Sequence, residues 1–308
     1  MTEIWDFLRG ALMTKALAAV VDAGVPEALA AGPRAVSELS DNPDTLYRLL
    51  RALASEGVFR ETEPSVFEHT ELSRRLLGPG TSEFAHLFGG VFYEATANLT
   101  ASTSETSFSH RFGADFWSWL AEHPDERATF DAAMAGGREH PAEALAALEW
   151  NDDEVVVDVG GGNGALLVEL IERRPGLRGI VLDRPETVRD EAALGDRIEF
   201  VAGSFFDSVP TGDSFVLSGI LHDWPDEDAA RILRTIREAA DSHARLLIHE
   251  SVIVSGNEPD HAKWLDLLML VLAGGRERTE EQWRSLLEST GWEPTKFLES
   301  DVIEARPA

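Results

Sequence analysis

The hydrophobic pattern of the chain changes near residue 154. Before this point apolar residues recur mainly at helical spacing, and after it short apolar runs alternate with amphipathic segments. Apolar strands separated by helices are typical of a parallel sheet that is covered on both faces. The second half therefore predicts an α/β fold, a doubly wound Rossmann-like domain, and the first half predicts a mainly helical domain.

The strands of this sheet follow from the individual apolar runs. Strands are predicted at 155–159, 179–182, 198–201, 214–217 and 245–248, helices at 164–173, 226–239 and 280–290, and a closing hairpin at 294–308. The helix at 226–239 begins with three acidic residues, which we interpret as favourable charges at a helix N-terminus. Ligands of such folds bind at the carboxyl ends of the strands.

The first hundred residues predict a winged helix. Helices at 12–21, 36–39 and 44–57 are followed by two short strands, 58–61 and 66–69, and by a helix at 71–77. Winged helices often read DNA. A formal net charge of −28 opposes a phosphate backbone, so we expect a packing or dimerisation role and no nucleic-acid partner.

Composition narrows the function further. The 308 residues contain no cysteine, which excludes a disulfide framework, thiolate metal sites and cysteine nucleophiles. We see neither a membrane span nor a secretion signal, and therefore expect a cytoplasmic protein without a membrane partner.

A glycine loop follows the first strand, reading Asp158-Val-Gly-Gly-Gly-Asn-Gly-Ala165. The spacing of Gly160, Gly162 and Ala165 also fits the dinucleotide fingerprint, so NAD is an alternative ligand. The Asp158 carboxylate would oppose a pyrophosphate, but it suits the ammonium and sulfonium groups of S-adenosylmethionine. Asp183, at the end of the second strand, can accept hydrogen bonds from ribose hydroxyls of either cofactor.

The tyrosines also argue against a dehydrogenase. Neither Tyr47 nor Tyr93 has a lysine four residues later, so the Tyr and Lys pair of one large dehydrogenase class is missing. We therefore favour S-adenosylmethionine over NAD.

Three segments together carry a family resemblance: the glycine loop, Gly203–Phe206, and the Leu-His-Asp-Trp-Pro-Asp-Glu run at 221–227. The chain resembles the class I small-molecule O-methyltransferases, which include plant caffeate and flavonoid enzymes and bacterial enzymes of aromatic antibiotic biosynthesis. The resemblance covers nearly the whole chain. It implies a winged-helix dimerisation domain at 1–100 and a cofactor-binding domain at 101–308, with a helical segment covering the substrate at 101–150. It also implies a homodimer that acts on a small aromatic substrate.

The resemblance assigns the cofactor site by motif. The implied contacts are Asp158, Gly160, Gly162, Asp183, Ser204, Phe205 and Ser218. Most relatives have an aspartate where this chain has Ser204, so the contact to the adenine amino group would rely on a hydroxyl without a charge.

A histidine is the candidate base. His222 follows the fourth strand, and an imidazole of ordinary pKa ~6.5 can accept a phenolic proton. The resemblance implies His222 as catalytic base flanked by Glu250 and Glu277, either of which could fix the imidazole tautomer. Taken alone, His222 could equally be a packing or surface residue. A metal site with His249 and His261 is a minor alternative, and we expect no metal.

Four apolar residues are candidates for the acceptor pocket. Phe130 and Met134 lie four residues apart in a predicted helix, and Leu268 and Met269 lie between the two glutamates. Core packing is the competing interpretation. Alternatives to O-methylation are C- or N-methyl transfer, a relative that no longer methylates, and a winged-helix regulator that senses the cofactor.

Overall fold

The computed structural model describes residues 4–99, 105–136, 141–185, 187 and 195–308. The chain divides into two units, Met1–Arg138 and Glu139–Ala308, and each is described by itself. None of the helices in the described ranges combines the length and apolar character that crossing a membrane requires.

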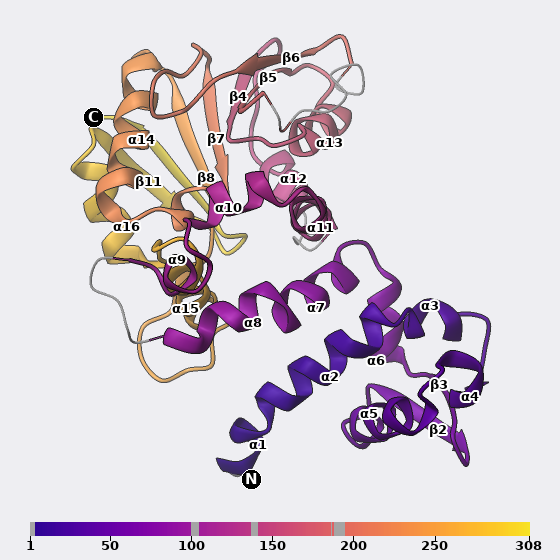
Figure 1. Ribbon diagram of the computed structural model, residues 1–308. Coiled ribbons are helices and arrows are strands. Elements are labelled where there is room, and N and C mark those ends of the chain that lie inside the picture. The colour runs from indigo at the N-terminus through magenta and orange to yellow at the C-terminus, as the bar shows by residue number, and fades with distance from the viewer. Residues whose placement is uncertain (1–3, 100–104, 137–140, 186, 188–194) are drawn as a thin grey trace. The chain divides into compact units, whose positions relative to one another are not determined.

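The N-terminal part of the first unit is a winged helix (Figure 1). Its helices are α1 (Ile4–Leu8), α2 (Gly10–Asp22), α3 (Val25–Leu29), α4 (Val36–Leu39) and α5 (Pro43–Ser55). The strands β1 (Arg34–Ala35), β2 (Phe59–Glu63) and β3 (Val66–His69) form an antiparallel sheet in the order β1-β3-β2. Helix α5 begins where the Asn42 side chain accepts a hydrogen bond from Thr45 N, and it buries Leu46, Leu50 and Leu53. The predicted helices and wing are confirmed, whereas the short α1, α3 and β1 were not predicted.

The rest of the first unit is helical, as expected. It contains α6 (Glu71–Arg74), η1 (Arg75–Leu77), α7 (Thr81–Gly89), α8 (Val91–Ala95), η2 (Thr96–Asn98), α9 (Ser107–Phe112), α10 (Phe116–Glu122) and α11 (Pro124–Gly136). Aromatic rings join α9, α10 and α11: the Phe116 centroid lies 5.1 Å from that of Phe108 and 5.4 Å from that of Phe130. The Phe116 ring also lies 6.1 Å from that of Phe92 in α8, and 107–136 belong to the first unit, whereas the sequence placed the boundary at residue 100.

The second unit is built on one seven-stranded sheet (Figure 1). Its strands are β4 (Val155–Val159), β5 (Arg178–Asp183), β6 (Ile198–Ala202), β7 (Ser214–Ser218), β8 (Arg245–His249), β11 (Trp292–Phe297) and β12 (Val302–Pro307). The order is β11-β12-β8-β7-β4-β5-β6. Strands β4 to β8 pair in parallel, and β12 lies antiparallel between β8 and β11. The doubly wound sheet and the closing hairpin are confirmed.

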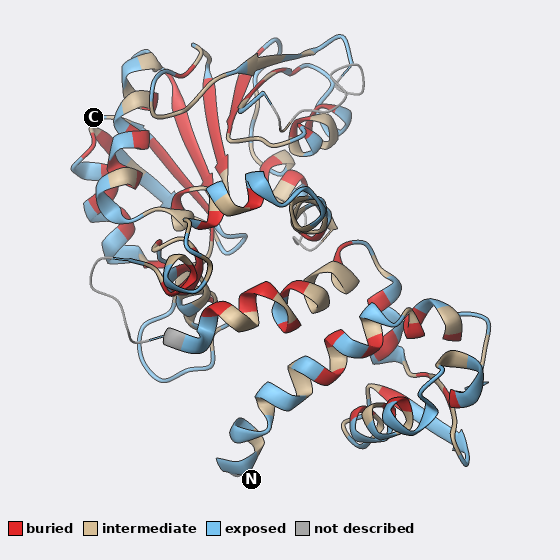
Figure 2. Ribbon diagram, viewed as in Figure 1, coloured by how far each residue is buried: buried red, intermediate tan, exposed pale blue. Residues whose placement is uncertain are grey.

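Alternate residues of the central strands pack on opposite faces of this sheet, because side chains of a strand point alternately to its two sides. Val157 belongs to a core with α14 (Asp226–Ala239) and α16 (Glu280–Glu288), and its neighbour Val156 belongs to a core with α12 (Pro141–Ala146) and α13 (Ala165–Arg173). Figure 2 shows the central strands buried. Both faces are therefore covered, which explains the continuous apolar runs.

Further elements of the second unit were not predicted from the sequence, among them α15 (Ala262–Leu272) and the short parallel pair β9 (Val252–Ile253) and β10 (Arg278–Thr279). The parallel order of β4, β5, β7 and β8 brings their carboxyl ends to one edge of the sheet. The glycine loop follows β4 at this edge, and the other three strands end in Asp183, Ser218 and His249.

Candidate functional site

The glycine loop turns sharply between β4 and α13. Gly160, Gly162 and Gly164 have φ angles of 77°, 62° and 79°, in the left-handed region that glycine adopts without strain. Gly161 is needed for a different reason, since a Cβ there would lie 2.4 Å from Asp158 Oδ2. Asp158 is 1% exposed. The loop backbone therefore passes directly over a buried carboxylate.

Asp183 holds this loop from the neighbouring strand. Its Oδ2 accepts a hydrogen bond from Gly162 N at 2.8 Å. Its Oδ1 accepts from Arg184 N at 2.6 Å and from Thr187 Oγ1 at 3.1 Å. A carboxylate oxygen has two acceptor positions, so among the described residues Oδ2 uses one position and can also accept from a ligand hydroxyl. The sequence predicted the ligand contact of Asp183 but not its bond to the loop.

We predict that Gly161→Ala weakens binding of S-adenosylhomocysteine. Displacing the Asp158 carboxylate by overpacking costs about 1–3 kcal/mol, which corresponds to a loss of affinity of about 5- to 150-fold. Titration calorimetry measures this loss. Gly10→Ala is the matched control, because a Cβ on Gly10 meets no atom within 4 Å. Unchanged affinity in Gly161→Ala would contradict the prediction.

The other three residues of the predicted cofactor site lie in two places. A Cβ on Gly160 would lie 3.4 Å from the Phe205 ring, so Phe205 lies beside the loop. The Ser204 hydroxyl accepts a hydrogen bond from Phe206 N at 3.2 Å. Ser218 ends β7, and its Oγ lies 3.3 Å from His249 Nδ1.

His222 lies in the short η4 helix (Leu221–Asp223) that follows β7. Its Nδ1 lies 2.6 Å from Glu277 Oε1, and its side chain is 13% exposed. An Nδ1–H donated to the carboxylate leaves the lone pair of a neutral imidazole on Nε2. Asp223 Oδ1 lies 3.6 Å from Nε2, too far for a hydrogen bond. Nε2 is therefore the ring nitrogen available to accept a proton.

The charge of the imidazole differs from the sequence-based expectation. Burial lowers the pKa of His222, but the charges of Asp223, Glu250 and Glu277 and the hydrogen bond to Glu277 together outweigh burial and raise the pKa to about 9. The sequence assumed an ordinary histidine that is mostly neutral at working pH. A pKa of about 9 instead favours the imidazolium form of His222 at pH 7.

Glu250 has a different role from Glu277. Its Oε1 accepts hydrogen bonds from Ile220 N at 3.0 Å and Leu221 N at 2.6 Å. The sequence allowed either glutamate to bond to the imidazole. The hydrogen bond to the imidazole is made by Glu277, while Glu250 binds the backbone that leads into His222. Burial raises the pKa of Glu250.

Glu250→Ala is expected to lower the free energy of unfolding by about 2 kcal/mol, since it leaves two backbone N–H groups without their acceptor. Glu250→Gln keeps an amide oxygen in the same place and should lose less than half of that stability. Urea denaturation of both variants tests the difference. Equal stability of the two variants would show that this backbone contact contributes little.

Several residues around His222 were not among the predicted site residues. Arg276 N donates to His222 O at 2.8 Å. Arg278, 1% exposed, contacts the same turn. Asp226 forms ion pairs with both arginines. From the sequence we had interpreted its carboxylate only as a favourable charge at the N-terminus of the helix. The one sequence feature that could have indicated these contacts is the pair of arginines, Arg276 and Arg278, on either side of Glu277.

His222, Glu250 and Glu277 form a compact cluster. One potential ligand atom from each lies within 4.8 Å of the others, a geometry that a metal ion could also use. The minor metal alternative had grouped His222 with His249 and His261 instead. Phe130 and Met134 lie in α11 of the first unit, and Leu268 and Met269 lie in α15 of the second. Their joint lining of an acceptor pocket stays a prediction.

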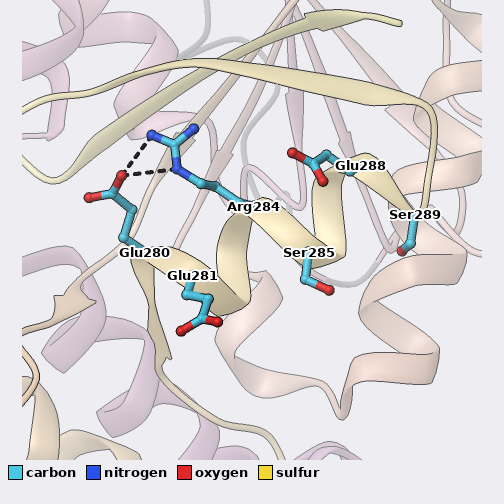
Figure 3. A pocket seen from close by; sticks show the side chains of 6 residues that line it. All are labelled: Glu280, Glu281, Arg284, Ser285, Glu288 and Ser289. Carbon is cyan, nitrogen blue, oxygen red and sulfur yellow. Dashed lines mark hydrogen bonds and ion pairs between the residues drawn. The ribbon is translucent and has the colours of Figure 1, made fainter.

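A surface pocket lies away from the predicted residues. Figure 3 shows its polar lining along α16, where Arg284 Nη2 pairs with Glu280 Oε1 at 2.6 Å. None of the predicted site residues lines it.

Comparison with known proteins identifies the class of enzyme to which the chain belongs. Models of the O-methyltransferase domain and of the O-methyltransferase dimerisation domain match residues 92–293 and 5–79. The chain is 36% identical to phenazine O-methyltransferase PhzM of Lysobacter antibioticus, over 98% of this chain and 95% of that protein. The structure of mitomycin 7-O-methyltransferase MmcR has a TM-score of 0.91 and 34% identity, and covers 99% of this chain and 97% of that one. That of NcsB1 from neocarzinostatin biosynthesis, in complex with S-adenosylmethionine and 2-hydroxy-5-methyl naphthoic acid, has a TM-score of 0.81 and 29% identity, with 96% of each chain covered.

The fold and these matches define a Rossmann-like methyltransferase with an N-terminal dimerisation domain. The chain belongs to the O-methyltransferase family, and the resemblance stated from its sequence is confirmed. The enzyme transfers a methyl group to oxygen.

Proposed function

We propose that this enzyme methylates a hydroxyl of a small phenolic metabolite and that His222 is the general base. One observation carries the proposal: the 2.6 Å contact between His222 Nδ1 and Glu277 Oε1, at the carboxyl end of β7. This contact orients the imidazole and directs its proton-accepting nitrogen away from Glu277.

The methyl donor of this enzyme is S-adenosylmethionine. When bound, it supplies an electrophilic methyl group on a sulfonium. The described residues fit such a ligand: three glycines with positive φ open the backbone of the loop, and the buried Asp158 carboxylate complements a positive charge. Asp183 would bind the ribose through Oδ2, and Phe205 would lie against the nucleoside side of the loop.

The acceptor proton is handled by His222 and its carboxylates. A phenol of pKa ~10 is a poor nucleophile until its proton is removed or shared. His222 accepts this proton at Nε2, while Glu277 holds Nδ1–H and stabilises the imidazolium that forms. Because the pKa of His222 is raised to about 9, transfer from a phenol is close to balanced.

The relatives support an aromatic acceptor. The NcsB1 complex contains a hydroxylated naphthoic acid, and the names of the other two proteins refer to phenazine and mitomycin. We propose Phe130, Met134, Leu268 and Met269 as apolar walls for a flat ring.

Isotope-labelled S-adenosylmethionine tests the proposed reaction. Incubation with a panel of phenols, anilines and ring-carbon acceptors should give a labelled methyl ether, identified by mass spectrometry and fragmentation. Labelled aniline or carbon products without any ether would overturn the assignment to phenolic oxygen.

We also propose a homodimer formed through the N-terminal domain. The matched dimerisation model covers residues 5–79, and α1 and the start of α2 expose the apolar side chains of Trp5, Leu8 and Leu12. Analytical ultracentrifugation of the full chain decides between dimer and monomer.

A further inference from the structure

The carbonyl oxygens of the turn that carries His222 are bound by one short segment, Gly274–Arg278. Arg278 Nη1 donates to Leu221 O at 3.0 Å, and its Nη2 donates to Trp224 O at 3.0 Å. Between them, Arg276 N donates to His222 O at 2.8 Å. Three carbonyl oxygens of the turn are thus bound by residues that flank Glu277.

The guanidinium of Arg278 is fixed on its other sides. Its Nε donates to Asp226 Oδ1 at 3.0 Å, and its Cζ lies 5.0 Å from the ring centroid of Trp283. A guanidinium has five donors in a planar arrangement, so it can bind two carbonyls and a carboxylate together. A lysine ammonium at the end of a flexible chain cannot reproduce this geometry.

Gly275 allows the segment to approach the turn. A Cβ at this position would lie 2.0 Å from His222 O and 2.7 Å from Trp224 N. No side chain fits there, and the hydrogen bond from Arg276 N to His222 O depends on this close approach. The same segment also supplies Glu277 to the imidazole. This segment therefore contacts both the backbone and the side chain of His222, while Glu250 binds the N–H groups of Ile220 and Leu221.

We propose that Arg278 is a positioning residue for methyl transfer, which holds the backbone of the Leu221–Trp224 turn so that the His222 imidazole lies on Glu277. The inference rests on the proposed function, since it assumes that His222 is the base. It assigns to Arg278 no contact with substrate or cofactor.

The test compares Arg278→Gln and Arg278→Lys with the unmodified enzyme. Displacing a catalytic group by about 1 Å costs about 100-fold in rate, so kcat should fall about 100-fold in Arg278→Gln, while KM for S-adenosylmethionine changes less than about twofold. Arg278→Lys keeps the charge and should recover only a small part of kcat. Gly275→Ala displaces the turn without removing a charge and should lower kcat in the same way.

Arg245→Gln is the matched control for loss of a buried arginine. Arg245 is 7% exposed and binds Glu154 and Ser214 at the amino end of β8, the opposite end of the strand from the site. This variant should lose stability but keep kcat in the folded fraction. A similar fall of kcat in Arg245→Gln would show that general destabilisation explains the effect.

A measurement without turnover separates the positioning role of Arg278 from the role of His222 as general base. The His222 imidazole can be titrated by NMR, with its signal identified by its absence in His222→Ala. In Arg278→Gln and Gly275→Ala the pKa of His222 should fall, because the contact with Glu277 is weakened. An unchanged titration, with His222→Ala inactive, would overturn the positioning role and leave the base intact. Conversely, a lowered pKa together with an active His222→Ala would refute His222 as base.

Discussion

His222→Ala is expected to lower kcat by about 10³-fold while leaving the affinity for S-adenosylhomocysteine within about twofold, because a general base contributes about 10²–10⁴-fold and does not hold the cofactor. The glycine loop and Asp183 lie at the ends of β4 and β5, and neither bonds to His222 in the described contacts. Steady-state kinetics and titration calorimetry on the same preparation give both quantities.

The control for this variant is His243→Ala. His243 is an exposed residue that precedes β8, so its loss should change neither kcat nor affinity. Near-normal turnover in His222→Ala would reject the assignment of the base. Calorimetry with a nicotinamide dinucleotide should give no binding. Binding of that ligand in place of S-adenosylhomocysteine would restore the NAD alternative.

The fold could be predicted because the physical signals are local. Strand β4 is a run of valines with Asp158 at its only polar position, and such a run fits only a strand buried on both faces. The loop after β4 could also be predicted from the sequence alone. Gly160, Gly162 and Gly164 all have positive φ, a conformation that glycine adopts without strain, and their spacing is visible in the sequence without knowledge of tertiary contacts.

The domain boundary was harder because helices 107–136 carry no local sign of which core they join. Their aromatic residues could pack against either domain, and the pattern alone did not decide. The contact between the rings of Phe116 and Phe92 is tertiary, and it joins these helices to α8 of the first unit. The family models place residues from 92 onward with the O-methyltransferase domain, so sequence families and compact units divide the chain differently.

The candidate site was only partly predictable. Motifs indicated His222, Glu250 and Glu277, but not which glutamate bonds to the imidazole. That choice depends on how the segment of Glu277 packs against the turn, which is set by contacts between residues more than fifty positions apart. The raised pKa of His222 has this origin only in part, because it depends on the charge of the adjacent Asp223 as well as on the hydrogen bond to the distant Glu277.

Glu277→Gln is expected to change the pH dependence of kcat/KM as well as its magnitude. In the unmodified enzyme only the neutral imidazole accepts a proton, so kcat/KM should rise about tenfold per pH unit below about 9 and level off above it. Removing the Glu277 charge and its strong hydrogen bond lowers the pKa of His222, so a larger fraction of the variant is neutral at pH 7. Poorer orientation of the ring should lower the plateau by about 100-fold. The two effects oppose each other at pH 7 and not above pH 9, so the deficit of the variant should be larger at high pH.

The ratio of kcat/KM of the variant to that of the unmodified enzyme, taken at each pH, cancels the ionisation of the acceptor itself. Glu281→Gln, on the exposed face of α16, makes the same charge change and should keep the ratio near one at every pH. A deficit of Glu277→Gln that is constant from pH 7 to 10 would mean that Glu277 does not set the pKa of the catalytic base.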